Sequence, residues 1–424
     1  MSTAQIQALT SSELRALSTA QLDKLSTAQF ASLTSAAVAS LTTAQVASIS
    51  TAKVQLLDSS QIKALAATQV GALTSAQINS LSTTQVQALS AAGVSSISTT
   101  ILGQVGTTQV SALTSSQMKA LTSAQLATLS ASTASTAFSL LSTSQIASLS
   151  SSQTKGLSPA QVSNLFSAGR ITALVPNALT TLTSAQTSTL TSTQLALLST
   201  AQIQGLGTQV IRSLTAAQLP GLTTGQIAAL TQAQAKAISA SQLGVGGLTT
   251  AQTAALTTYD IAALDTTALA SLQLSALTNA QVKALSNTQV KTLSTAQVAA
   301  LSTSQTQQLT VDAIKTLTTA QIAALTTTQV NTMTATQVAA LSATQLNALT
   351  SAQVPVLNAS GLKSLALAGM NDTKLAYLTQ TQIDGLSADQ WNSLGSSKRR
   401  SILNTVVNGA ITAPLRRLAP LAVR

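Results

Sequence analysis

Histidine and cysteine are absent from this 424-residue chain. Without cysteine, disulfides and thiolate metal sites are excluded. Without histidine, the commonest general base and metal ligand is missing. Charged residues make up only 7% of the sequence, against roughly 25% in typical domains. We therefore predict that the protein is not an enzyme and carries no cofactor or metal.

Long apolar runs are absent as well. Ser, Thr or Gln interrupts every few positions, so no stretch approaches the roughly 18 to 20 apolar residues of a transmembrane span. Met1 is followed at once by repeat residues such as Ile6 and Leu9, and we expect no cleavable secretory signal. Because 45% of the residues are hydrophobic, the chain has enough aliphatic surface to fold.

What the sequence does contain is an octapeptide repeat. Leu or Ile recurs at every eighth position from Leu9 to Ile97, and a typical octad is Leu-Ser-Thr-Ala-Gln-Val-Ala-Ala at 293–300. We interpret residues 1–397 as one array and 398–424 as a basic and apolar tail. The register slips at 130–140, 166–173, 239–247, 272–277 and 366–377, which we interpret as inserted turns.

Three structures could carry a period of eight residues: one continuous α-helix, a β-solenoid and a series of short helices. In one continuous α-helix the Leu positions would drift by about 80° per octad and mark no fixed face. In a β-solenoid the sixth-position Val and the following Leu, three residues apart, would point to opposite faces. One short helix per octad remains, and the sequence supplies its start signal.

That signal is a capping box. With Ser294 as N-cap, Gln297 is the N3 residue, and the pair can exchange hydrogen bonds. Leu293 and Val298 then occupy the two positions of a hydrophobic staple, and Pro159 falls at N1 after a serine, where a missing N–H costs little. Glycines before the next Leu predict left-handed helix ends: Gly156, Gly205, Gly221 and Gly385. Pro220 and Pro355 fall inside the short helix and predict distorted units.

We therefore predict an all-α fold, an elongated α-solenoid of short capped helices with one helix per octad. Such short helices are not stable alone and must share burial with their neighbours. We expect Leu and Val inside, and Ser, Thr, Gln and the variable seventh position outside.

Lysines favour the seventh position, and the tail is basic. The candidate contacts for an anionic partner such as nucleic acid are Lys63, Lys119, Lys155, Lys283, Lys291, Lys398, Arg399, Arg400, Arg416 and Arg417. A basic stripe would gain affinity through counterion release. The alternative is a slot that tolerates any polar residue, since Gln7, Arg15 and Asp23 also occupy it. The tail is open to two interpretations, an export or membrane-surface segment and a capping helix with a frayed end.

Other chemical patterns have structural explanations. Asp260 with Asp265, and Asp384 with Asp389, are the closest acidic groups, and solvated surface acids explain them better than a paired-carboxylate site. The many serines lack a catalytic setting. Regular Ser-Thr pairs suggest an ice-binding hydroxyl array, but helix capping would consume these hydroxyls.

The octads at Leu293–Ala300 and Leu317–Ala324 resemble those of large proteobacterial repeat proteins often labelled haem-utilisation or adhesion proteins. The resemblance covers roughly Met1 to Leu394 and implies a secreted or cell-surface bacterial protein. The label also implies haem binding, for which the available axial ligands are Met118, Met333, Met370, Tyr259 and Tyr377.

Our first hypothesis is a non-enzymatic structural or adhesive repeat protein of a bacterial surface or the extracellular space, reached without a cleavable N-terminal signal. It would act as a stalk, an adhesin or a self-associating filament subunit, with further copies or an extracellular polymer as partner. The alternatives are an intracellular, cytoplasmic scaffold that binds acidic partners or nucleic acid, and an ice-binding protein.

Overall fold

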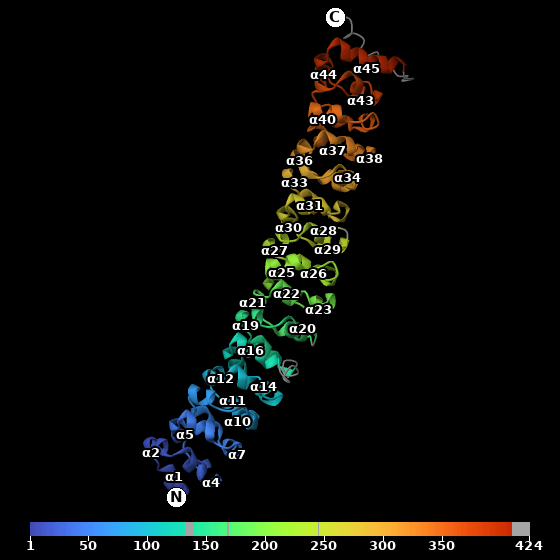
Figure 1. Ribbon diagram of the computed structural model, residues 1–424. Coiled ribbons are helices and arrows are strands. Elements are labelled where there is room, and N and C mark those ends of the chain that lie inside the picture. Colours follow the sequence, from blue (N-terminus) through green and yellow to red (C-terminus); the bar gives the residue numbers. More distant parts are fainter. Residues whose placement is uncertain (132–139, 168, 245, 409–424) are drawn as a thin grey trace. The chain divides into compact units, whose positions relative to one another are not determined.

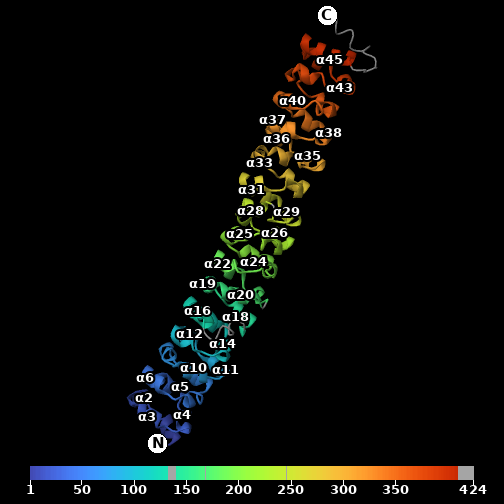
Figure 2. The same cartoon turned by 45° about the vertical axis from the view of Figure 1, so that its right-hand side comes forward.

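The computed structural model describes residues 1–131, 140–167, 169–244 and 246–408. Contacts divide the chain into two compact units, Met1–Ala237 and Ile238–Arg424. Throughout the described residues the regular structure is helical, with no strand. Figures 1 and 2 show that short helices follow one another in stacked layers within each unit. The predicted all-α repeat solenoid, with one short helix per octad, is confirmed.

The first unit contains the helices that follow. They are α1 (Thr3–Gln7), α2 (Ser11–Ala16), α3 (Thr19–Asp23), α4 (Thr27–Ala31), α5 (Ser35–Ser40), α6 (Thr43–Ser48), α7 (Thr51–Val54), α8 (Ser59–Ala64), α9 (Ala67–Gly71), α10 (Ser75–Ser80), α11 (Thr83–Ala88), α12 (Ala91–Ser96), α13 (Thr99–Leu102), α14 (Thr107–Ala112), α15 (Ser115–Ala120), α16 (Ser123–Ala131), α18 (Thr143–Ala147), α19 (Ser151–Lys155), α20 (Pro159–Ser167), η1 (Arg170–Ala173), α21 (Pro176–Leu179), α22 (Ser184–Thr187), α23 (Ser192–Ala196), α24 (Thr200–Gly205), α25 (Thr208–Ser213), η2 (Leu219–Gly221), α26 (Thr224–Ala228) and α27 (Gln232–Lys236).

The second unit continues the same pattern. Its helices are α28 (Ala240–Leu243), α29 (Thr250–Ala255), α30 (Thr258–Ala263), α31 (Thr266–Ser271), η3 (Leu274–Ala276), α32 (Asn279–Lys283), α33 (Asn287–Thr292), α34 (Thr295–Ala299), α35 (Thr303–Gln308), α36 (Val311–Thr316), α37 (Thr319–Ala324), α38 (Thr327–Thr332), α39 (Ala335–Ala339), α40 (Ala343–Ala348), η4 (Val354–Val356), α41 (Ala359–Leu362), η5 (Leu367–Gly369), α42 (Asp372–Leu375), α43 (Gln380–Asp384), α44 (Ala388–Ser393) and α45 (Ser396–Asn408).

Most of the α-helices begin with the predicted capping box. In α34 the Ser294 N–H donates to Gln297 Oε1 at 3.0 Å, and the Gln297 N–H donates to Ser294 Oγ at 3.1 Å. Leu293 and Val298 are both buried. Pro159 is the first residue of α20, as predicted. The local start signals in the sequence therefore place the helices correctly.

Three octads make one turn of the solenoid. Helix α5 packs against α8, α8 against α11, and α11 against α14, so each helix rests on the one three octads earlier. We call such a series of helices in successive turns a column. Leu and Val side chains from the three columns fill the interior, as in Val86 and Leu89.

The prolines distort their units in the expected way. Pro220 lies in η2 and Pro355 in η4, where short 3-10 helices replace the α-helix. The reason is that proline has no N–H to donate within an α-helical turn. The short steps at 272–277 and 366–377 likewise contain η3 and η5, whereas most of the slip at 130–140 lies outside the described residues.

The prediction for the glycines is wrong. Gly156 and Gly385 end their helices with right-handed φ values of −77° and −79°, and among described glycines only Gly169 and Gly246 have positive φ. Gly205 and Gly221 are instead required by close approach, because an added Cβ would lie 2.4 Å from Pro176 O and 2.2 Å from Ser192 O.

Candidate functional site

The most extensive polar feature of the structure is built by the N3 glutamines. Gln85 Oε1 accepts the Ser82 N–H at 2.9 Å and so caps α11. Its Nε2 donates to Val54 O at 3.1 Å and to Leu57 O at 2.8 Å, in the turn below. Gln85 is only 5% exposed. One amide therefore closes its own helix and joins it to the preceding turn.

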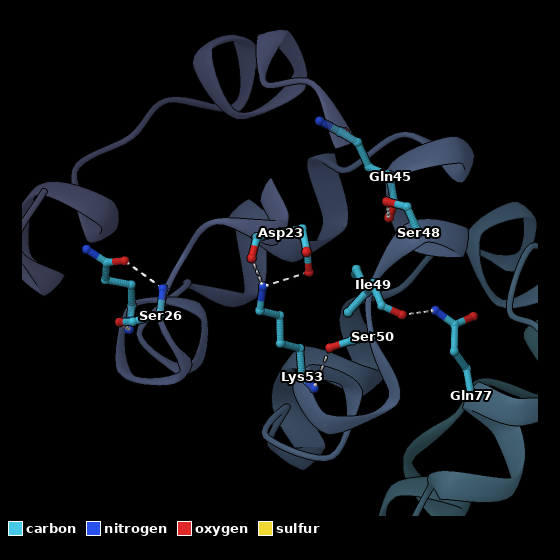
Figure 3. A network of polar contacts seen from close by, with 9 residues as sticks. Asp23, Ser26, Gln45, Ser48, Ile49, Ser50, Lys53 and Gln77 are labelled. Atoms are coloured by element: carbon cyan, nitrogen blue, oxygen red, sulfur yellow. Dashed lines mark hydrogen bonds and ion pairs between the residues drawn. The ribbon is translucent and has the colours of Figure 1, made fainter. Parts of the chain in front are cut away.

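This arrangement recurs along both units, and we call it the glutamine ladder. It consists of the N3 glutamines whose Nε2 donates to carbonyls of the turn below, such as Gln77 to Ile49 O at 2.7 Å (Figure 3). The prediction that Gln lies outside is wrong, because these side chains are buried. Burial of the amide is tolerated because its oxygen and both N–H groups have hydrogen-bond partners.

The ladder follows spatial turns rather than sequence distance. Gln77 donates to carbonyls 28 and 31 residues earlier. Above the 130–140 insertion, Gln145 donates to carbonyls 32 and 35 residues earlier. Above the short step at 272–277, Gln289 reaches only 25 and 28 residues back. These two register slips are therefore absorbed between rungs without breaking the ladder.

Lysine replaces glutamine at three described N3 positions. Lys53 is 7% exposed, donates to the Asp23 carbonyl and forms an ion pair with Asp23 Oδ1 at 3.1 Å (Figure 3). Lys374 donates to Leu349 O, and Lys398 donates to Ala368 O. The ammonium group thus takes over the inter-turn bond of the glutamine amide.

Glutamate replaces glutamine at the N3 position of α2, which is Glu13. Its carboxylate accepts the Thr10 N–H and the Thr10 hydroxyl, both at 2.8 Å. The backbone hydrogen bond from Thr10, followed by the hydroxyl hydrogen bond, holds the pKa of Glu13 below its ordinary value.

The seventh-position lysines do not gather on one face. Lys63, Lys119 and Lys155 are exposed on α8, α15 and α19. Helix α8 contacts α5 and α11, α15 contacts α12 and α18, and α19 contacts α16 and α21. These are three different columns. Contact of these lysines with an anionic partner stays a prediction, but they do not form one stripe along the first unit.

The seventh-position lysines of the second unit also lie on different columns. Lys283 and Lys291 are exposed on the consecutive helices α32 and α33. Helix α32 contacts α30 and α35, whereas α33 contacts α31 and α36, so these two lysines also belong to different columns.

The basic residues of the tail begin in α45. Lys398 and Arg399 are half-buried, and Arg400 is exposed. Arg399 Nε donates to Leu394 O at 2.8 Å, so two of the three basic residues bond to backbone carbonyls. Arg416 and Arg417 lie outside the described residues. The helix supports the capping interpretation over residues 396–408.

Three of the four paired acidic residues accept hydrogen bonds from their own helices. Asp260 Oδ2 accepts the Thr257 N–H at 2.8 Å, and Asp265 Oδ1 accepts the Ala268 N–H at 2.7 Å. Asp384 accepts Gln380 Nε2 at 2.6 Å. In the described part of the chain, no group of three or more His, Cys, Asp or Glu side chains is placed to hold a metal ion.

The residues suggested for haem ligation do not converge. Met118, Met333 and Met370 are buried core residues, Tyr259 is exposed, and Tyr377 is 38% exposed. Met118 lies in α15, while Met333 and Met370 follow α38 and η5. The methionines therefore replace aliphatic residues of separate repeats rather than lining one cofactor pocket.

Surface hydroxyls surround one open hollow of about 660 Å³. It lies between α8, α11, α12 and α15, and its lining includes Lys63, Thr84, Gln87 and Ser90. N-cap hydroxyls such as Ser82 accept their own N3 N–H, as expected for capping. Hydroxyls at the following position remain on the surface, and ice binding through them stays a prediction.

Comparison with known proteins identifies repeats of one type. A family model described as the ALTTAQ repeat matches residues 6–43, 54–91, 195–232 and 274–311. No curated protein shows a significant match to the chain. Within the described residues, no helix has the length and apolar character to cross a membrane. The chain is therefore a repeat protein, with four segments similar to ALTTAQ repeats.

Proposed function

We propose that the protein is a non-enzymatic structural element of a bacterial surface or the extracellular space, acting as a stalk or adhesin. The observation that carries this proposal is the glutamine ladder, whose buried amides join successive turns within each unit. Because the buried amides bond to the next turn, they favour an array that can be extended by further turns rather than a reaction centre.

The surface also supports a role in display or spacing. The seventh position holds different polar residues, such as the exposed Gln87 and Lys63 on α11 and α8. At some units its side chain bonds to the turn above, as Gln55 Nε2 does to Ser80 O at 3.2 Å. A partner rich in hydroxyl groups, such as an extracellular polymer, could hydrogen-bond to the Ser, Thr and Gln side chains that line the open hollow beside Lys63.

Localisation is tested first. An antibody raised against the purified chain is applied to intact and to permeabilised cells of the source organism. A surface protein is labelled on intact cells and removed by added protease, while a cytoplasmic protein is labelled only after permeabilisation. Labelling restricted to permeabilised cells would overturn the proposed location.

The mechanical role is tested by pulling a single molecule from both ends. A stalk built from equivalent turns should lengthen in small repeated steps. Each turn of three octads releases about 24 residues, or about 80 Å of extended chain. One cooperative rupture of the whole molecule would contradict a spacer made of equivalent turns.

The matched variants for this assay are Gln85→Ala, which removes one rung, and Gln87→Ala, which alters the surface of the same helix. The rung variant should lower the force of the first step, and the surface variant should leave the force unchanged.

A further inference from the structure

The open hollow beside Lys63 lies entirely within the first unit. Its volume of about 660 Å³ falls within the roughly 300 to 1,000 Å³ of sites that hold small molecules. Residues of α8, α11, α12 and α15 line it. Helices α8 and α11 are successive layers of one column, whereas α12 and α15 are successive layers of another. A ligand in the hollow would therefore contact two columns at once.

Many polar groups in the hollow take no part in holding the fold together. Ser90 and Thr114 are used, because each accepts the N–H of its own N3 residue. The described structure gives no hydrogen bond to the side chains of six other lining residues, all of them exposed: Ser59, Ser60, Lys63, Thr84, Gln87 and Ser116. These groups are available to a ligand without loss of a bond within the fold.

The hollow carries one positive charge. Lys63 is the only charged residue among those described in its lining. Asp58 precedes the lining residue Ser59, but its carboxylate caps α8 by accepting the Gln61 N–H at 2.8 Å. Because an exposed ion pair alone contributes little, Lys63 would hold an anion there only if the rest of the ligand also made contacts.

The remaining lining is aliphatic and comes from Ala88, Leu89 and Ala91. No aromatic residue is among the described lining residues, so a nucleobase would find no stacking platform. A sugar ring suits the hollow better, because its C–H groups can contact the aliphatic side chains while its hydroxyls bond to Ser and Thr. The single ammonium group then favours a sugar that also carries one anionic group.

We propose that this hollow binds an acidic sugar unit, a sugar ring with one carboxylate, as part of an extracellular polysaccharide. Lys63 pairs with the carboxylate, and the hydroxyls of Ser60 and Thr84 bond to those of the ring. The inference rests on the proposed function, because a surface or extracellular location brings such a polymer to the protein. Each contact is exposed to solvent and contributes little, so we expect a Kd on the order of 1 mM for one site.

The test measures binding to the purified full chain by saturation-transfer NMR, which detects weakly bound ligands. The probe is a trimer of galacturonic acid, in which each sugar ring carries one carboxylate. Its methyl ester keeps the ring hydroxyls without the charge and should bind about two- to fivefold more weakly. Acetate supplies the charge without the ring and should bind at least about tenfold more weakly. Acetate binding as tightly as the trimer would reduce the site to a charge contact and overturn the proposal.

The role of Lys63 is tested against a lysine at the same repeat position. Lys63→Gln should weaken binding of the trimer about two- to fivefold and leave binding of the methyl ester unchanged. Lys119→Gln is the matched control, because Lys119 is exposed on α15 and does not line the hollow. Equal losses in the two variants would indicate attraction to the overall positive charge and overturn the assignment of this site.

The hydroxyl contacts are tested with Thr84→Val, which keeps the shape of the side chain and removes its hydroxyl. It should weaken binding of the trimer and of the methyl ester alike, by about two- to fivefold. The control is Thr108→Val, since Thr108 holds the equivalent exposed position on α14, outside the lining of the hollow. Thr84→Val with unchanged affinity for both ligands would contradict the proposed binding mode.

Failure of this proposal and failure of the proposed function give different results. A chain that binds none of these ligands has no acidic-sugar site, yet its labelling on intact cells would still establish a surface protein. Labelling only after permeabilisation would overturn the location, while the affinities of the purified chain would remain as measured.

Discussion

Removing one rung of the glutamine ladder should weaken the array far more than removing a surface glutamine from the same helix. Gln85 and Gln87 are two residues apart in α11. Gln85 is buried and its side-chain amide has four hydrogen-bond partners, while Gln87 is exposed. The Ala substitution changes helix propensity about equally at both positions, so the difference between the variants isolates the ladder.

The magnitude follows from the bonds lost. Gln85→Ala removes the cap bond to the Ser82 N–H and the donations to the carbonyls of Val54, Gln55 and Leu57. Each bond contributes about 0.5 to 1.5 kcal/mol, and a buried group left without a partner costs about 1 to 3 kcal/mol. Water that enters the vacated space offsets part of this cost. We expect a loss of about 2 to 4 kcal/mol for Gln85→Ala and less than about 0.5 kcal/mol for Gln87→Ala.

Hydrogen exchange read residue by residue is the suitable assay, because an array of this kind need not unfold in one step. Protection should fall in α11 and in the turn below it, around Val54 and Leu57, and remain unchanged several turns away. Urea denaturation followed by circular dichroism supplies the global value. Equal losses for the two variants would refute the claim that the ladder joins the turns.

Three further predictions concern single positions. Lys53→Gln restores the usual rung, and the free energy of unfolding should stay within about 1 kcal/mol of the unaltered protein. Lys53→Met removes the donor and should lower the free energy of unfolding by about 1 to 3 kcal/mol, measured by urea denaturation. Gly93→Ala places Cβ 2.8 Å from a methyl group of Val70 and should lower the free energy of unfolding by about 1 to 3 kcal/mol, measured by thermal denaturation. Its control is Gly225→Ala, which should not destabilise the protein because the nearest atom to the added Cβ is 3.9 Å away. The lowered pKa of Glu13 means that its stabilising contribution is present above the unfolded-state pKa and disappears as pH falls through the folded-state pKa. An NMR titration should show this lowered pKa, and Thr10→Ala should raise it only in part, because the hydrogen bond from the residue 10 backbone N–H remains.

Much of the fold could be predicted because its signals are local. The Ser294 and Gln297 pair specifies a helix start within four residues, and the Leu period sets one helix per octad. The distortion of the helix at Pro220 could be predicted for the same reason, since its missing N–H affects only its own turn. These inferences require no knowledge of which turn lies next to which.

Features that depend on contact between turns could not be predicted in the same way. The second role of Gln85 involves Val54 O, 31 residues earlier, and no local pattern indicates that distance. Gly205 was misjudged for the same reason, because the Pro176 carbonyl that demands its small size belongs to the turn below. A signal was nonetheless present, since surface capping alone would accept Glu or Asp at N3 as readily as Gln, whereas the repeat uses Gln almost throughout.

The preference for Gln over an acidic residue also explains how the array tolerates changes in length. A carboxylate would keep the cap bond but would face the two carbonyls below without a proton to donate, whereas an amide satisfies both directions at once. Because the ladder needs only carbonyls at the right place in space, the short step at 272–277 shifts the partners of Gln297 to 25 and 28 residues back without loss of a rung. Turns can therefore be shortened or extended between rungs, provided that the N3 amide and the Leu and Val rows are retained. Variation is then left to the exposed seventh position, which holds Gln87 on α11 and Lys63 on α8.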